Sequence, residues 1–190
     1  AQPAQQKLWG AAAKNWQVVS QGAGVALTGA HLLPTELVKK VTDVGRSLIG
    51  ADNLPQYQPE LGKGGKSRGR LAGRVGDRYA QTTGIYLPAC VNTMFGPQGG
   101  GKGATDSFVA LLERAGVALE VPQGIDKLCC GTPWSSKGMQ AGHDVMEQRV
   151  RDIVMDATDG ARLPVIVDAS SCTAGFKDML ESVGITVIDA

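Results

Sequence analysis

Four cysteines are the residues of this chain best suited to chemistry. Cys129 and Cys130 are adjacent and precede Gly131 directly, and the other two are Cys90 and Cys172. Short apolar runs that predict β-strands come before each cysteine position, at residues 84–88, 117–121 and 164–168. Parallel strands bring their carboxyl ends to one edge of a sheet, where ligands bind in open α/β folds. The sequence therefore predicts that the four thiols meet in one site.

Four thiolates form a soft ligand set, which is typical of iron-sulfur clusters, zinc or copper. The adjacent pair Cys129 and Cys130 favours a cluster of several irons, because a tetrahedral zinc usually takes spaced pairs such as C-x₂-C. Cys172 lies at the start of a predicted helix, whose dipole should lower the pKa of its thiol. Gly131 should leave backbone room beside a bulky cluster. The alternative is that the cysteines are small buried core residues without a ligand.

A glycine-rich loop at residues 96–103 nearly spells a phosphate-binding P-loop between a predicted strand and a helix. Its last position is Gly103, where a P-loop has the Ser or Thr that holds magnesium. The fragment at residues 22–24 lacks the third glycine and the preceding strand of a dinucleotide site. Nucleotide binding through Lys102 and its loop is therefore a third hypothesis that the pattern does not favour.

The two histidines, His31 and His143, are not spaced as a zinc pair, and the sequence contains no C-x-x-C. A hydrolytic triad of Ser171, His143 and Asp168 can be drawn, but nothing marks a nucleophile elbow. Neither a zinc ribbon nor a hydrolase is indicated.

The elements that must position the cysteines alternate along the chain from Gly84 onward. Predicted strands fall at 84–88, 117–121, 164–168 and 185–189, and predicted helices at 104–115, 138–158 and 173–183. Helix-length connections between short strands indicate βαβ units with right-handed crossovers. We therefore predict an α/β fold with a small four-stranded parallel Rossmann-like sheet and helices on its faces, preceded by a helical segment.

The rest of the chain divides into two predicted segments. Residues 1–50 indicate a helical connector, with apolar spacing that places Trp9 and Trp16 on one packing face. Residues 51–83 are rich in glycine, proline and basic side chains and indicate a linker or surface arm. The basic residues of that arm are Lys63, Lys66, Arg68, Arg70, Arg74 and Arg78. A solvated linker is the simple interpretation, and docking on another domain or an anionic group is the alternative.

Composition limits the classes of function. The chain has 190 residues, 43% of them hydrophobic, and a net charge of +1, which excludes wholesale attraction to nucleic acid. No stretch reaches the roughly 18 apolar residues of a membrane span. Four cysteines near turns are more typical of a reducing compartment than of a disulfide framework, so we expect a cytoplasmic protein. Because the chain lacks a first methionine and stops at an apolar strand, we also expect a piece of a longer polypeptide.

Three segments around the cysteines, residues 86–96, 128–138 and 167–173, resemble the cysteine-rich CCG domain. That domain occurs in heterodisulfide reductase and in the iron-sulfur subunits of glycolate oxidase and anaerobic glycerol-3-phosphate dehydrogenase. It also occurs in D-lactate dehydrogenases that fuse a flavin domain to iron-sulfur modules, and the residues around the cysteines here are most similar to these. The resemblance covers residues 84–190, and the helical lead-in also looks like the connector of that group.

The resemblance implies that Cys90, Cys129, Cys130 and Cys172 bind a 4Fe-4S cluster, with Gly131 beside them. The first cysteine of the family's C-x-x-C falls on Ala169, so four thiolates remain, too few for the non-cubane cluster of heterodisulfide reductase.

In such enzymes FAD, here outside this chain, oxidises a 2-hydroxy acid, and electrons pass through iron-sulfur centres to a quinone or cytochrome. The implied partners are the flavin and ferredoxin-like domains of the parent protein and no nucleic acid, with the parent in the cytoplasm or peripheral on the inner membrane face. The fragment itself would hold no catalytic residue. Lys137 and His143 would offset cluster charge or serve an acceptor, and the alternative for both is a place on the surface without such a role. The alternative is a structural or docking domain with idle or zinc-bound cysteines.

Overall fold

The structure is a computed structural model that describes residues 3–51, 54 and 56–190. Three helices open the chain: α1 (Pro3–Lys14), α2 (Trp16–Ala30) and α3 (Thr35–Ile49). The predicted helical character of the first 50 residues holds for the part that the structure describes. Asn15 separates α1 from α2, and Gly50 ends α3 with a positive φ of 94°.

The sheet has five strands in the order β1-β3-β2-β4-β5. They are β1 (Gly73–Gly76), β2 (Thr82–Leu87), β3 (Ala118–Val121), β4 (Val165–Val167) and β5 (Val187–Asp189). Strands β3, β2, β4 and β5 pair in parallel, which confirms the predicted α/β class and the four parallel strands. The fifth strand, β1, pairs antiparallel with β3 at the edge.

Strand β1 corrects the prediction for residues 51–83, where no strand was expected. Glycines with positive φ begin and end this strand, and only Val75 inside it is buried, so no alternating pattern marks it. A 3₁₀ turn, Arg68–Leu71, precedes β1. Residues 73–76 therefore form a strand because they pair with β3, and their own β-propensity does not explain the strand.

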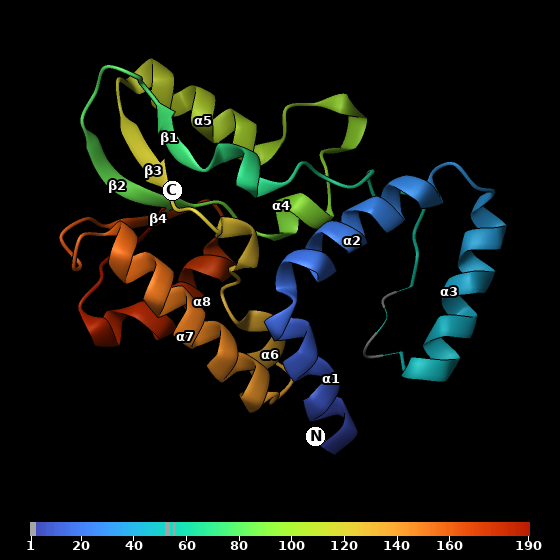
Figure 1. Cartoon of the computed structure of the whole chain (residues 1–190). Coiled ribbons are helices and arrows are strands. Elements are labelled where there is room, and N and C mark those ends of the chain that lie inside the picture. Colours follow the sequence, from blue (N-terminus) through green and yellow to red (C-terminus); the bar gives the residue numbers. More distant parts are fainter. Residues whose placement is uncertain (1–2, 52–53, 55) are drawn as a thin grey trace.

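Helices cover both faces of the sheet. Helix α5 (Gly103–Ala115) lies on one side, and α7 (Gln140–Ala157) and α8 (Ser170–Leu180) lie on the other (Figure 1). These three helices match the predicted crossovers, as βαβ topology requires. Two single-turn helices, α4 (Val91–Met94) and α6 (Thr132–Ser135), closely follow the cysteine positions 90 and 129–130.

The N-terminal helices are joined to this α/β body by their tryptophans. The rings of Trp16 and the fully buried Trp134 pack edge to face, 5.0 Å between centroids, and the Trp134 indole donates to the Trp9 carbonyl at 2.9 Å. The predicted tryptophan packing face is thus present.

Helix α3 behaves differently, because it stands away from the body (Figure 1) and leaves Val41 and Leu48 more than half exposed. An apolar groove of about 800 Å³ lies between α2 and α3. Among the described residues, no helix combines the length and the apolar character that crossing a membrane requires.

Candidate functional site

The structure brings the four cysteines together at the carboxyl edge of the parallel strands. Cys90 follows β2, the pair Cys129 and Cys130 follows β3, and Cys172 lies in the first turn of α8 after β4. The Sγ atoms of Cys90 and Cys129 are 3.7 Å apart, and Cys130 lies close enough to Cys129 and Cys172 to affect the pKa values of both thiols. All four side chains are buried, with exposed fractions between 1 and 7%. They therefore form one continuous series of thiols inside the fold.

The series is extended rather than compact. Four sulfurs around one tetrahedral zinc would all lie about 3.8 Å from one another, given a Zn–S bond of about 2.3 Å. Within the part of the chain that the structure describes, no three of the sulfurs lie within 4.8 Å of one another; the group that does is His143, Asp144 and Glu147, on a single stretch of α7. A single zinc ion is thus a poor match for the thiols as they stand.

The thiols differ in their tendency to ionise. Hydrogen bonds from Cys129 and Cys172 lower the pKa of Cys130 far below its ordinary range, and a hydrogen bond from Cys129 lowers that of Cys90. The interactions with Cys130 raise the pKa of Cys129 and of Cys172, and burial adds to both increases. The expectation that the helix start lowers the pKa of Cys172 is therefore wrong, because the interaction with Cys130 and burial both raise it. The pKa values of Cys90 and Cys130 are thus lowered, and those of Cys129 and Cys172 are raised.

Arg68 lies beside the cysteine turns, although the sequence predicts a linker or surface arm for its segment. Only 2% of it is exposed, so it is not part of a solvated arm. Its guanidinium donates to the carbonyl of Pro88 at 2.7 Å and to that of Leu128 at 2.8 Å, so it joins the two turns that carry Cys90 and the cysteine pair. Among the described residues it makes no ion pair with a carboxylate. Its charge instead helps to lower the pKa of Cys90.

Nothing in the local sequence separates Arg68 from the other basic residues of its segment. The turn that contains Arg68 is fixed through Ser67. The Ser67 hydroxyl accepts from the Gly69 N–H within the turn at 3.2 Å and donates to Asp126, outside the segment, at 2.7 Å. A buried cation without a carboxylate partner is costly, which makes its place near the thiol of Cys90 informative.

Asp168, which the sequence suggested only for a hydrolytic triad with Ser171 and His143, organises the turn before Cys90. Its carboxylate accepts hydrogen bonds from the Tyr86 hydroxyl and from the Ala89 N–H, both at 2.7 Å. Thr105 and Asn92 donate to it as well, at 3.1 and 3.3 Å. These bonds fix the end of β2, and burial together with the nearby carboxylate raises the pKa of Tyr86. Asp168 is therefore a structural acceptor rather than part of a triad.

Replacing Tyr86 by phenylalanine should lower the free energy of unfolding by about 1 kcal/mol, because the half-buried carboxylate of Asp168 loses one of its donors. Urea denaturation of the two proteins measures the difference. Tyr79→Phe is the matched control, since this tyrosine is 82% exposed, and its change should stay below about 0.5 kcal/mol. Equal effects of the two substitutions would argue against the role of the Asp168 network.

Gly131 fits the expectation that space is needed at this position. Its φ is +79°, and a Cβ there would lie 2.3 Å from the end of Met179 and 3.0 Å from the His143 ring. His143 therefore packs directly against the turn of the cysteine pair, whereas Lys137 lies over the ring of Trp9, 5.7 Å from its centroid. Of the two residues suggested to offset cluster charge, the structure brings His143 to the site.

Gly175 was not singled out from the sequence, although it matters equally. A Cβ at this position would lie 2.2 Å from the carbonyl oxygen of Cys130, so α8 packs on the backbone of the cysteine pair. A lone glycine within a helix is the signal that could have indicated this close approach.

Comparison of the chain with protein-family models, curated proteins and solved structures finds no match. The site therefore has to be interpreted from its own geometry and chemistry.

Proposed function

We propose that this chain is the iron-sulfur electron-transfer module of a flavin-dependent D-lactate dehydrogenase, or of a close 2-hydroxy-acid dehydrogenase. The observation that carries the proposal is the series of four buried thiols at one sheet edge, next to a buried guanidinium without a carboxylate partner. The resemblance of the cysteine segments to the CCG domain supplies the class of parent enzyme.

The donor set suits an iron-sulfur cluster better than it suits a single ion. Cys90, Cys129, Cys130 and Cys172 would hold a 4Fe-4S cluster, which supplies one-electron transfer when bound. Thiolates are the binding form, and two of the four thiols already have lowered pKa values. The sulfurs are too far apart to bind one ion together, so each could bind a different iron atom of a cluster.

Arg68 would serve this site through its charge. Four thiolates placed in a buried pocket repel one another, and a fixed cation close to them reduces that cost. Because Arg68 also holds the carbonyls of Pro88 and Leu128, its charge stays in place while the ligand turns keep their spacing. Charge near a cluster is one of the factors that set its reduction potential.

In the proposed parent, FAD in another domain would oxidise the 2-hydroxy acid, and electrons would pass through this module toward a quinone or cytochrome. The apolar groove between α2 and α3 would then contact the flavin or ferredoxin-like domain. We expect this chain alone not to oxidise lactate, because the hydride chemistry belongs to the flavin.

A structural or docking domain is the second candidate. The observation that favours it is that the thiols satisfy one another by hydrogen bonds while fully enclosed, as idle core cysteines would. The exposed apolar side of α3 would then be the working surface.

Anaerobic reconstitution with ferrous iron and sulfide tests the proposal. We expect about four iron atoms and four acid-labile sulfides per chain, with an electron paramagnetic resonance signal after reduction. Parallel loading with zinc separates the two candidates. Stoichiometric zinc that iron and sulfide do not displace, or no metal at all, would support the docking domain instead.

A further inference from the structure

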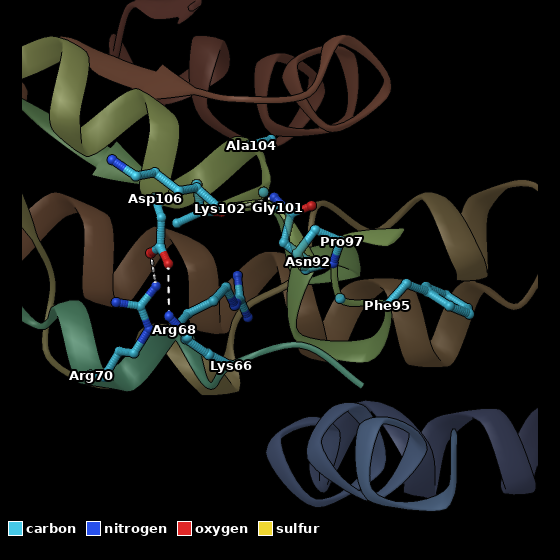
Figure 2. Close-up of a pocket in the computed structure, with 13 residues that line it drawn as sticks. Lys66, Arg68, Arg70, Asn92, Phe95, Pro97, Gly101, Lys102, Ala104 and Asp106 are labelled. Carbon is cyan, nitrogen blue, oxygen red and sulfur yellow. Dashed lines mark hydrogen bonds and ion pairs between the residues drawn. The ribbon is translucent and has the colours of Figure 1, made fainter. Parts of the chain in front are cut away.

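A polar cavity of about 210 Å³ lies beside the N-terminus of α5, and none of the four cysteines lines it. Figure 2 shows that its walls come from two distant segments, the basic stretch around Arg68 and the glycine-rich loop that leads into α5. Four cationic side chains line it: Lys66, Arg68, Arg70 and Lys102. Tertiary folding thus gathers basic residues that the sequence scatters over a linker and a loop.

Only part of this positive charge is neutralised within the chain. Asp106 binds Lys66 at 3.0 Å and also pairs with Arg70, as the dashed lines in Figure 2 show. For Lys102 and Arg68, the described residues provide no carboxylate within ion-pairing distance. Four cations against one carboxylate leave an excess of three positive charges on the cavity wall, and two of the cations, Lys102 and Arg68, have no ion-pair partner.

The burial of Arg68 adds to the reason to expect a ligand. Its side chain is almost fully buried, with an exposed fraction of 2%, and its Nε has no hydrogen-bond partner. The other two guanidinium nitrogens bind carbonyl groups, which carry no net charge. A buried cation in this state is stabilised by an anion close by.

The loop into α5 offers backbone donors to such an anion. Gly101, Gly103 and Ala104 line the cavity, and no side chain caps the first turn of this 13-residue helix. Free N–H groups and the positive end of the dipole at a helix start favour phosphate groups. Gly99 and Gly103 have positive φ values, a backbone conformation that favours glycine. The loop therefore carries no side chain at these two positions. This is the near-P-loop of residues 96–103, which has Lys102 at the lysine position of the motif and lacks the hydroxyl that would hold magnesium.

We propose that this cavity binds a phosphate dianion, either as inorganic phosphate or as the phosphate group of a simple ester. A dianion would offset two of the three excess positive charges, whereas a carboxylate would offset only one. None of the four cysteines lines this cavity, so it is a separate site from the one proposed for the cluster, although Arg68 borders both. Without the Ser or Thr of a P-loop, it would hold phosphate without magnesium.

Titration of the purified chain with inorganic phosphate at low ionic strength, followed by calorimetry and ³¹P resonance, tests the proposal. We expect saturable binding at one site per chain. Lys102→Ala should weaken binding by about tenfold, the loss of one charge-assisted bond, and it should leave the circular dichroism spectrum unchanged. Asp106→Asn should tighten binding, because it removes a competing carboxylate and frees Lys66 and Arg70.

Lys63→Ala is the matched control, because it removes one charge from the same basic segment but does not line the cavity. The affinity of this variant for phosphate should stay within about twofold of that of the parent chain, a smaller change than the loss of one charged hydrogen bond would cause. Methyl phosphate is the second probe. If the ligand is a phosphate ester, methyl phosphate should bind at least as tightly as inorganic phosphate, and if the ligand is free phosphate, it should bind more weakly. Absent saturation, equal binding of acetate, or equal losses in the Lys102 and Lys63 variants would each overturn the proposal.

Discussion

Replacing Cys130 by serine is expected to reduce the iron bound after anaerobic reconstitution from about four atoms per chain to less than one. Cys130 is central to the series of thiols, since it interacts with both Cys129 and Cys172, and these hydrogen bonds hold the pKa of its thiol far below the ordinary range. Serine keeps the size of the side chain, but a neutral hydroxyl is a poor ligand for iron. Iron and acid-labile sulfide analysis measures the loss.

Ser171→Ala is the control for this substitution. Ser171 is the neighbour of Cys172 in α8 and is exposed, so its removal should leave the bound iron unchanged. Thermal unfolding of the proteins without iron separates loss of ligand from loss of fold, since Cys130→Ser should keep a cooperative transition. If the serine variant took up as much iron as the parent chain, Cys130 would not be a ligand and the proposed site would be wrong.

Replacing Arg68 by methionine should lower the free energy of unfolding of the iron-free protein by about 3 kcal/mol. Methionine fills much of the same volume, but the carbonyls of Pro88 and Leu128 would lose charged donors at 2.7 and 2.8 Å and remain buried. Urea denaturation measures the change, and the slope of the transition should stay the same. Arg68→Lys should recover only part of the loss, because one ammonium cannot reproduce the two directed bonds of a guanidinium.

Arg74→Met is the matched control for Arg68. Arg74 belongs to the same basic segment and also donates to two carbonyls, those of Arg78 and Ala80, but it is exposed to solvent. Its loss should cost less than about 0.5 kcal/mol. Equal destabilisation by the two methionine variants would mean that Arg68 does not join the cysteine turns in the way we infer.

The parts of the fold that follow local rules could be predicted from the sequence. Short β-branched runs separated by helix-length connections are enough to indicate parallel strands and helices on both faces. The gathering of cysteines follows from the same pattern, because residues just after parallel strands share one edge wherever they lie in the chain. The glycine directly after the cysteine pair likewise marked a position where a side chain does not fit.

Other features depend on contacts between distant segments, which no local pattern reports. Strand β1 exists because β3 accepts it, and Arg68 is buried because Ser67 and Asp126 hold its turn. The ionisation of the thiols is also decided in this way, since hydrogen bonds between sulfurs outweigh the helix start at Cys172. The basic, glycine-rich composition of the segment around Arg68 does not indicate which of its side chains is buried, because exposed and buried segments can share that composition.

The amino-acid order by itself thus determined the α/β class, the alternation of strands and helices from Gly84 onward and the edge where four thiols gather, since each of these follows from local patterns in the chain. Only the tertiary structure decided which cation lies buried beside them and which basic side chains surround the cavity at α5. Burial and charge compensation are properties of the neighbours in space, and those neighbours come from segments far apart in the sequence.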